Sequence, residues 1–223
     1  MTVSEPTVYL PDDKFRQYVI AHYDVNKDNN ISISEANSVV SLDVSNRNIT
    51  SLEGIKYMNN LKELMCSGNN LSSLDISNNA NLEKLDCSHN SLNSLNVSRN
   101  TRLTYLDCAN NKLTSLAISG ATKLKYLFCT VNQLNALDVS HNISLETIAC
   151  SRNQIKKLDV TNNAALTWLS CEFNELDSLD ISKNTVLSVL KCNPMSSLKT
   201  VFMASNQIVN TLDIPSSAEI VRK

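Results

Sequence analysis

Cysteine recurs along this chain with a fixed period. Each of the seven cysteines lies 21 residues after the one before it, and they are Cys66, Cys87, Cys108, Cys129, Cys150, Cys171 and Cys192. Such a period indicates one unit copied along the chain, and a unit this short buries its apolar side chains only by stacking on its neighbours. The sequence therefore predicts a solenoid, in which the 223 residues form one elongated domain.

The apolar residues inside each unit predict strands. Counted from the leucine five residues before each cysteine, they fall at positions 1, 4, 6, 11, 14 and 16. A helix would place them at i, i+3, i+4 and i+7, whereas the alternation at positions 4 and 6 suits a short strand between two bends. We expect a mainly β, right-handed coil of short parallel strands, with little helix in the repeats and adjacent strands about 4.8 Å apart.

Asparagine occupies position 9 in six of the seven units, and Met195 is the exception. At this position the chain bends inward and leaves backbone groups that water cannot reach. An amide side chain donates and accepts hydrogen bonds at once, so it can satisfy both kinds of backbone group. We therefore predict a structural role for Asn69, Asn90, Asn111, Asn132, Asn153 and Asn174.

One cysteine per turn predicts a stack of inward-pointing thiols. Their Cβ vectors would run parallel, which disfavours a bridge between neighbours even where the Cα atoms lie within reach. We expect reduced, buried thiols that act as small apolar fillers. Disulfide formation and metal binding remain the alternatives.

The amino-terminal part has a different character. Residues 1–9 are expected to be a loose leader, and residues 10–38 a small helical cap. Pro11, Asp12 and Asp13 open an amphipathic run with Phe15 and Val19 on one side, which is typical of a helix with acidic residues in its first turn. This helix is predicted to cover the first coil.

A candidate calcium loop follows this helix, at residues 24–35. Alternate residues supply oxygen atoms with the spacing of an EF-hand loop, and these are Asp24, Asn26, Asp28, Asn30 through its carbonyl, Ser32 and Glu35. Asn29 stands where glycine is usual, but asparagine tolerates a positive φ. We expect a weak structural Ca²⁺ site, in the range of about 10⁻⁴ to 10⁻³ M. The alternative is a polar capping turn that binds no ion.

Residues 39–197 are predicted to form the repeats: one 22-residue unit, then the 21-residue units with the cysteines. Residues 198–223 are interpreted as a half-repeat and closing cap, because Pro194 and Met195 interrupt the pattern and Pro215 ends it. A terminal turn that departs from the repeat protects the exposed edge of a solenoid.

These motifs resemble a known family. ITSLEGIKYMNNLKEL, in the 22-residue unit, is similar to the first repeats of bacterial internalins, and the LxxLxCxxNxLxxLDVSxN units are similar to cysteine-ladder repeats of the internalin J type. The resemblance implies a leucine-rich-repeat solenoid from a secreted or cell-surface bacterial protein. It also implies an EF-hand-like cap that is truncated and metal-free in the family, which argues against calcium here.

Positions 3 and 5 flank the buried strand leucine and are predicted to face outward, on the concave side. In a chain with only 5% aromatic residues, four aromatic side chains fall at these positions, and exposed aromatic groups of this kind often mark contact sites. The alternative is that bulky residues simply suit strands. The predicted ligand-binding face consists of Tyr105, Tyr126, Phe128 and Trp168 with Lys84, Asp86, Asp107 and Lys191.

Composition narrows the function classes. A net charge of −2 without a basic stripe argues against nucleic acid, and the absence of a run of about 18 apolar residues argues against membrane insertion. No nucleophile and base pair emerges, so we expect no enzyme. The predicted function is a monomeric protein-binding module. Glycan binding on the aromatic stripe and a structural spacer role are the alternatives.

Overall fold

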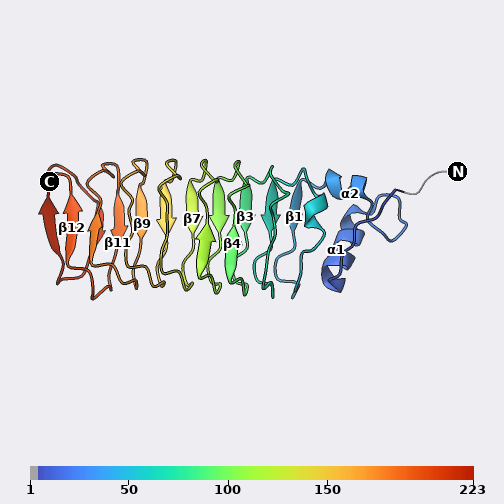
Figure 1. Cartoon of the computed structure of the whole chain (residues 1–223), viewed down its shortest axis with the longest axis horizontal. Helices are drawn as coiled ribbons and strands as arrows, with labels where there is room; N and C mark the ends of the chain where they lie inside the picture. The colour runs from blue at the N-terminus through green and yellow to red at the C-terminus, as the bar shows by residue number, and fades with distance from the viewer. Residues whose placement is uncertain (1–4) are drawn as a thin grey trace.

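The computed structural model describes residues 5–223. The chain forms a long stack of similar turns, with two helices at its amino-terminal end and the last strands at the other end (Figure 1). The predicted repeat solenoid is therefore confirmed. Among these residues, none of the helices has the length and the apolar composition of a membrane span.

A parallel sheet of nine short strands runs along one side of the stack. Its strands pair in the order β1-β2-β3-β5-β7-β8-β9-β11-β13. Partner residues lie 21 positions apart through most of the sheet, as in Glu63 with Lys84. The bounds are β1 (Ser41–Asp43), β2 (Glu63–Met65), β3 (Lys84–Asp86), β5 (Tyr105–Asp107), β7 (Tyr126–Phe128), β8 (Thr147–Ala149), β9 (Trp168–Ser170), β11 (Val189–Lys191) and β13 (Thr211–Asp213).

The opposite side of the stack carries shorter sheets. One has two strands, β4 (Ser94–Asn96) and β6 (Ser115–Ala117), and the other has three, β10 (Ser178–Asp180), β12 (Thr200–Met203) and β14 (Glu219–Arg222). Between them the chain runs in turns and extended segments, as the sequence predicts for the return side. Each turn therefore presents a continuous strand face on one side only.

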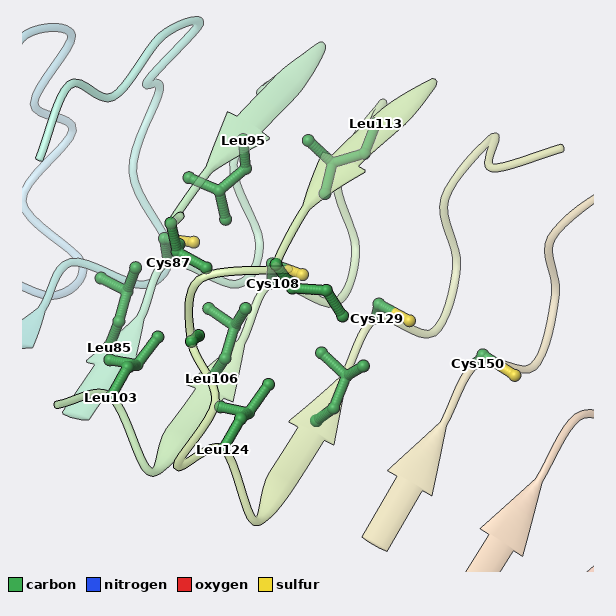
Figure 2. Close-up of a cluster of buried hydrophobic side chains, with 14 of the residues drawn as sticks. Leu85, Cys87, Leu95, Leu103, Leu106, Cys108, Leu113, Leu124, Cys129 and Cys150 are labelled. Atoms are coloured by element: carbon green, nitrogen blue, oxygen red, sulfur yellow. The ribbon is translucent and has the colours of Figure 1, made fainter. Parts of the chain in front are cut away.

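The interior consists of ladders of identical side chains. Figure 2 shows the leucines of successive strands and the cysteines lying in parallel rows. All seven cysteines are fully buried free thiols, which confirms their expected role as apolar fillers. Burial disfavours the charged thiolate, and it raises the pKa of the Cys129 thiol to about 12.

The asparagines at position 9 join neighbouring turns. The Asn132 amide nitrogen donates to the carbonyl oxygens of Cys108 and Cys129 at 3.0 and 3.1 Å. Its oxygen accepts from the Leu113 amide at 2.9 Å. One side chain thus satisfies backbone groups of two turns, as predicted.

A second asparagine ladder lies on the other side of each turn, and the sequence reasoning gave it no role. The Asn163 amide, for example, donates to the carbonyls of Val139 and Asn142. Ala121 interrupts this row, and its neighbour Gly120 lies so close to Ser98 that an added Cβ would come within 1.8 Å of the Ser98 carbonyl oxygen. The members of this ladder are Asn79, Asn100, Asn142, Asn163 and Asn184.

The amino-terminal cap consists of helix α1 (Asp13–Tyr23) and helix α2 (Ile33–Ser38). As predicted, Phe15 and Val19 are buried under the first helix. Residues 5–9, which were expected to be loose, instead pack on the cap. Thr7 forms a β-bridge with Ser32, and the Val8 amide donates to the Ile31 carbonyl at 2.7 Å. The rest of the predicted leader lies outside the described residues.

The carboxyl-terminal end continues the repeat further than expected. Residues 198–203 complete the second half of the turn that contains Cys192, and β13 adds another strand to the long sheet, with Leu190 opposite Leu212. The half-repeat predicted from residue 198 is thus followed by one more strand of the long sheet before the chain ends. The Arg222 guanidinium then donates to the carbonyls of Ala204, Ser205 and Gln207, which closes the last turn.

The asparagine ladder yields a stability prediction. Asn132→Ala removes three hydrogen bonds and leaves the buried Leu113 amide without its acceptor, so we expect a loss of roughly 3 kcal/mol in unfolding free energy. Urea denaturation followed by circular dichroism measures it. The control is Asn135→Ala at an exposed position, expected to change stability by less than about 0.5 kcal/mol. Equal midpoints for both variants would contradict the ladder's role.

The junction between the cap and the first turn yields a second prediction. Asp12 accepts from the amides of Lys14 and Phe15 at the start of α1 and, through its other oxygen, from Thr50 at 2.7 Å. Partial burial raises the pKa of Asp12, but these hydrogen bonds outweigh it and hold the pKa below its usual range. Its stabilising effect is thus complete above about pH 4 and is lost as the pH falls through the folded-state value.

We therefore expect Asp12→Ala to lower stability by about 1 kcal/mol at neutral pH. The difference from wild type should shrink as the pH falls below about 4. Thermal melts at several pH values measure it. Asp13→Ala is the matched control, because the Asp13 carboxylate is exposed and pairs only with Arg16. A difference from wild type that stays constant with pH would show that the Asp12 charge is not what matters.

Candidate binding face

The long sheet brings the predicted face residues into two parallel rows. Position 3 gives Tyr105, Tyr126, Thr147 and Trp168 on successive strands, in direct register. Position 5 gives, in the same way, Asp86, Asp107, Phe128, Ala149, Ser170 and Lys191. The strand leucines between the rows point into the core. All eight predicted side chains therefore lie on one surface, which runs from β3 to β11.

Three of the four aromatic side chains form a cluster. The Tyr105 ring lies 5.6 Å from the Phe128 ring and 6.4 Å from the Tyr126 ring, centroid to centroid. The Lys84 ammonium lies 5.3 Å from the centre of the Tyr105 ring, a favourable cation–π arrangement. Tyr126 stays the most open of them, with 37% of its surface exposed.

The cluster is held in place by polar neighbours. The Tyr126 hydroxyl donates to the Glu146 carboxylate at 3.1 Å, and the Lys125 ammonium donates to the same carboxylate at 2.8 Å. These two hydrogen bonds lower the pKa of Glu146. The Tyr126 ring is thus fixed at its outer end before any ligand arrives, which reduces the entropy lost on binding.

Trp168 stands apart from the cluster. It lies two strands beyond Tyr126, with Thr147 between them, so about 10 Å separates the two side chains. Beside this gap Ala149 is buried, and the hydroxyls of Ser151 and Ser170 both donate to the Glu172 carboxylate. The sequence reasoning missed this polar group. Its only signal was variation at position 7, where Ser151 and Glu172 lie.

Two like charges face each other at one end of the surface. Asp86 and Asp107 are opposite one another on β3 and β5. Each uses one oxygen to accept a backbone hydrogen bond from the residue two further on, Ser88 or Ala109. Burial, with a smaller contribution from Asp86, raises the pKa of Asp107. Both aspartates therefore stabilise the backbone that follows their strand, in addition to placing a carboxylate on the surface.

The candidate calcium loop has a well-defined geometry in the described structure. Asn29 has φ of +63°, so the residue that replaces glycine does adopt the left-handed conformation. Asp24 accepts from the amides of Lys27, Asp28 and Asn29. Asp28 accepts from the Asn30 amide and the Asn26 side chain. The loop's acidic side chains are thus engaged by its own backbone and side-chain donors.

Glu35, the predicted closing ligand, is bound in the same way. Its carboxylate accepts from the amides of Val25 and Asn26 and from the amide and hydroxyl of Ser32. The amide of Ser32 makes the strongest contribution to lowering the pKa of Glu35. Within residues 5–223, no three acidic, histidine or cysteine side chains converge as a metal site would require. In this arrangement Glu35 closes a capping box at the start of α2.

The fold and the ladders define a leucine-rich-repeat protein, and the sequence links it to one member of that class. Over 71 residues the chain is 41% identical to internalin J of Listeria monocytogenes, a match that covers 32% of this chain and 8% of that protein. The solved functional domain of internalin J, described as including a cysteine ladder, is 28% identical with a TM-score of 0.55, over 99% of this chain and 62% of that one. The chain is thus similar to internalin J, in sequence over these 71 residues and in fold over nearly its whole length.

A second solved structure supports the fold. Internalin C2 of Listeria monocytogenes matches over the full length of both chains with a TM-score of 0.71 at 21% identity. No family model matches the sequence. The matched segment covers less than a tenth of the length of the curated internalin J, and the chain covers about three fifths of the solved domain.

Calcium binding by the loop at residues 24–35 stays a prediction, and its effect on thermal stability can test it. A weak site would stabilise the amino-terminal end by mass action. We expect millimolar Ca²⁺ to raise the thermal midpoint of the wild type by about 1–2 °C, within the range expected for a chain of this size. The midpoints of Asp24→Ala and of the charge-removing Asp24→Asn should not move. Equal shifts in all three proteins, or none, would leave the loop as a polar capping turn.

Proposed function

We propose that this chain is a non-catalytic protein-binding module of a secreted or cell-surface bacterial protein, with its ligand on the face of the long sheet. The observation that carries the proposal is the aromatic cluster Tyr105, Tyr126 and Phe128, with Trp168 two strands away on the same face. Aromatic side chains of this kind supply most of the binding energy at many protein interfaces.

The stiffness of the frame supports this proposal. The turns that carry the aromatic residues are hydrogen-bonded to their neighbours by the sheet and by the asparagine amides, so the face residues keep their relative positions. A rigid surface loses little entropy when a partner docks. The residues that vary between turns lie on this rigid frame, where a change of side chain alters the ligand without altering the fold. The similarity to internalins agrees with a binding role.

A glycan ligand is the second candidate, and one observation favours it. The gap between Tyr126 and Trp168 borders the hydroxyls of Ser151 and Ser170 and the Glu172 carboxylate. Both serines are buried and hold the half-buried Glu172 carboxylate in place. Aromatic walls beside that carboxylate offer a sugar ring a stacking surface and a hydrogen-bond acceptor.

The binding face predicts the behaviour of a double variant. Tyr126→Ala with Trp168→Ala removes two aromatic anchors and should weaken binding of a captured partner at least roughly tenfold. The test is affinity capture on the immobilised chain, followed by titration of each retained protein. Ser73→Ala with Ser178→Ala, both exposed on the opposite side, is the matched control and should bind like the wild type.

The same variants separate the candidates. Unchanged affinity of the double variant for every retained protein would refute the proposed face. A glycan-array signal that the double variant loses, with no retained protein, would establish the glycan candidate instead.

A further inference from the structure

One row of residues beside the binding face has a strained backbone. In six successive turns, the residue two after the cysteine adopts a left-handed conformation, with φ between +53° and +65°. These residues are Gly68, His89, Asn110, Val131, Arg152 and Phe173. Glycine, asparagine and histidine are the types enriched in this conformation. The first three turns therefore follow the rule.

The next three turns place other residue types in the left-handed conformation. Val131, Arg152 and Phe173 have φ of +57°, +56° and +54°. A positive φ is a true outlier for a β-branched or bulky residue, because Cβ crowds the backbone. Val131 and Phe173 do not gain burial in return, since 39% and 45% of their surfaces are exposed. Fold stability therefore does not explain these side chains, and strain of this kind clusters at functional sites.

The three residues form a continuous patch with a defined chemistry. The Arg152 guanidinium lies 4.2 Å from the centre of the Phe173 ring. Within residues 5–223, the Arg152 side chain makes no ion pair. The nearby Glu172 carboxylate instead accepts from Ser151 and Ser170. We call Val131, Arg152 and Phe173 the rim patch: two exposed apolar side chains and a guanidinium that stacks on one of them and makes no ion pair within the described residues.

The spacing of the rim patch favours a helical partner. Successive turns place its residues about 4.8 and 9.6 Å apart along the stack, following the strand spacing. Residues i, i+3 and i+7 of an α-helix lie on one face, at about 4.5 and 10.5 Å along its axis. Alternate residues of an extended strand lie at about 6.7 and 13.4 Å and fall out of step. A helix laid along the stack thus matches all three positions.

We propose that the rim patch docks an amphipathic helix of the protein partner, with apolar residues at i and i+7 and an acidic residue at i+3. This inference rests on the proposed function and names the class of its partner. The apolar residues contact Val131 and Phe173, and the carboxylate pairs with Arg152. The rim patch lies three residues beyond the ends of strands β7, β8 and β9, so such a helix would run along the edge of the binding face where Phe128 lies, rather than over Tyr126 and Trp168.

The test uses three synthetic helical peptides that differ at one position: Leu–Glu–Leu, Leu–Gln–Leu or Leu–Lys–Leu at i, i+3 and i+7. Fluorescence anisotropy with the full chain measures their affinity. We expect the glutamate peptide to bind at least about tenfold more tightly than the lysine peptide, and Arg152→Glu to reverse that order. Equal affinity of the three peptides, or no binding of any, would overturn the proposal.

A double variant of the chain tests whether the backbone strain serves binding. The double variant Val131→Asn with Phe173→Asn introduces asparagine, which tolerates the left-handed backbone, at both positions. We expect this double variant to melt at least about 2 °C higher than wild type and to bind the glutamate peptide roughly tenfold more weakly. His89→Asn, the control in the same row, should change neither property. A lower melting temperature or unchanged peptide binding of the double variant would refute the rim patch.

The outcomes separate this inference from the proposed function. If the Tyr126 and Trp168 variant loses its partner while the rim variants bind every probe as wild type does, the binding face stands and the helical partner is wrong. If the rim variants lose the peptide while the Tyr126 and Trp168 variant keeps every partner, the ligand lies on the rim and not on the sheet.

Discussion

The amide group of a buried asparagine is the interaction on which the solenoid depends. A turn that bends inward leaves carbonyl and amide groups away from water, and each such group destabilises the fold unless it finds a partner. Asn90 donates to the Cys66 and Cys87 carbonyls and accepts from Leu71, so it serves its own turn and the one before. Because this contact repeats in six successive turns, from Asn69 to Asn174, these turns are held together without disulfides or long helices.

The small thiol at position 6 complements this amide. Cysteine fills the space between strand and bend without adding a polar group that needs a partner, and burial keeps its proton in place by raising the pKa, as at Cys87. A larger residue would force the turns apart, and a smaller one would leave a cavity. The strict 21-residue period reflects both demands at once.

The repeats could be predicted from sequence because each element of the pattern has one physical explanation. Leucine at positions 1 and 4 and asparagine at position 9 specify strand, bend and stacking direction. The carboxyl-terminal end was harder to predict, because the strand at Thr211–Asp213 lacks the cysteine and is spaced 22 residues from its partner. Residues 5–9 also escaped prediction, since their bridge to Ser32 depends on contacts that no local pattern reveals.

The candidate site also has features that the sequence predicted and features that it did not. Alternation along each strand placed Tyr105, Tyr126 and Phe128 on one face, because the side-chain period of a strand is two. The hydroxyl and carboxylate group at Ser151, Ser170 and Glu172 joins two successive turns, and variation at position 7 alone did not reveal the contact. The backbone strain at Val131 and Phe173 is likewise visible only as a torsion angle. Periodicity thus predicts where side chains point, while their interactions across turns require coordinates.

The near-perfect registration of the turns has an evolutionary consequence. Each turn contacts only its neighbours, through the same strand pairing and the same amide bridges. Duplication or deletion of one whole 21-residue unit in the gene would therefore join turns that already fit. Such an event would lengthen or shorten the strand face by about 4.8 Å and would change which side chains become neighbours, with no new junction to optimise. A chain built in this way can evolve a new ligand surface by recombination between its own repeats, as well as by point mutation.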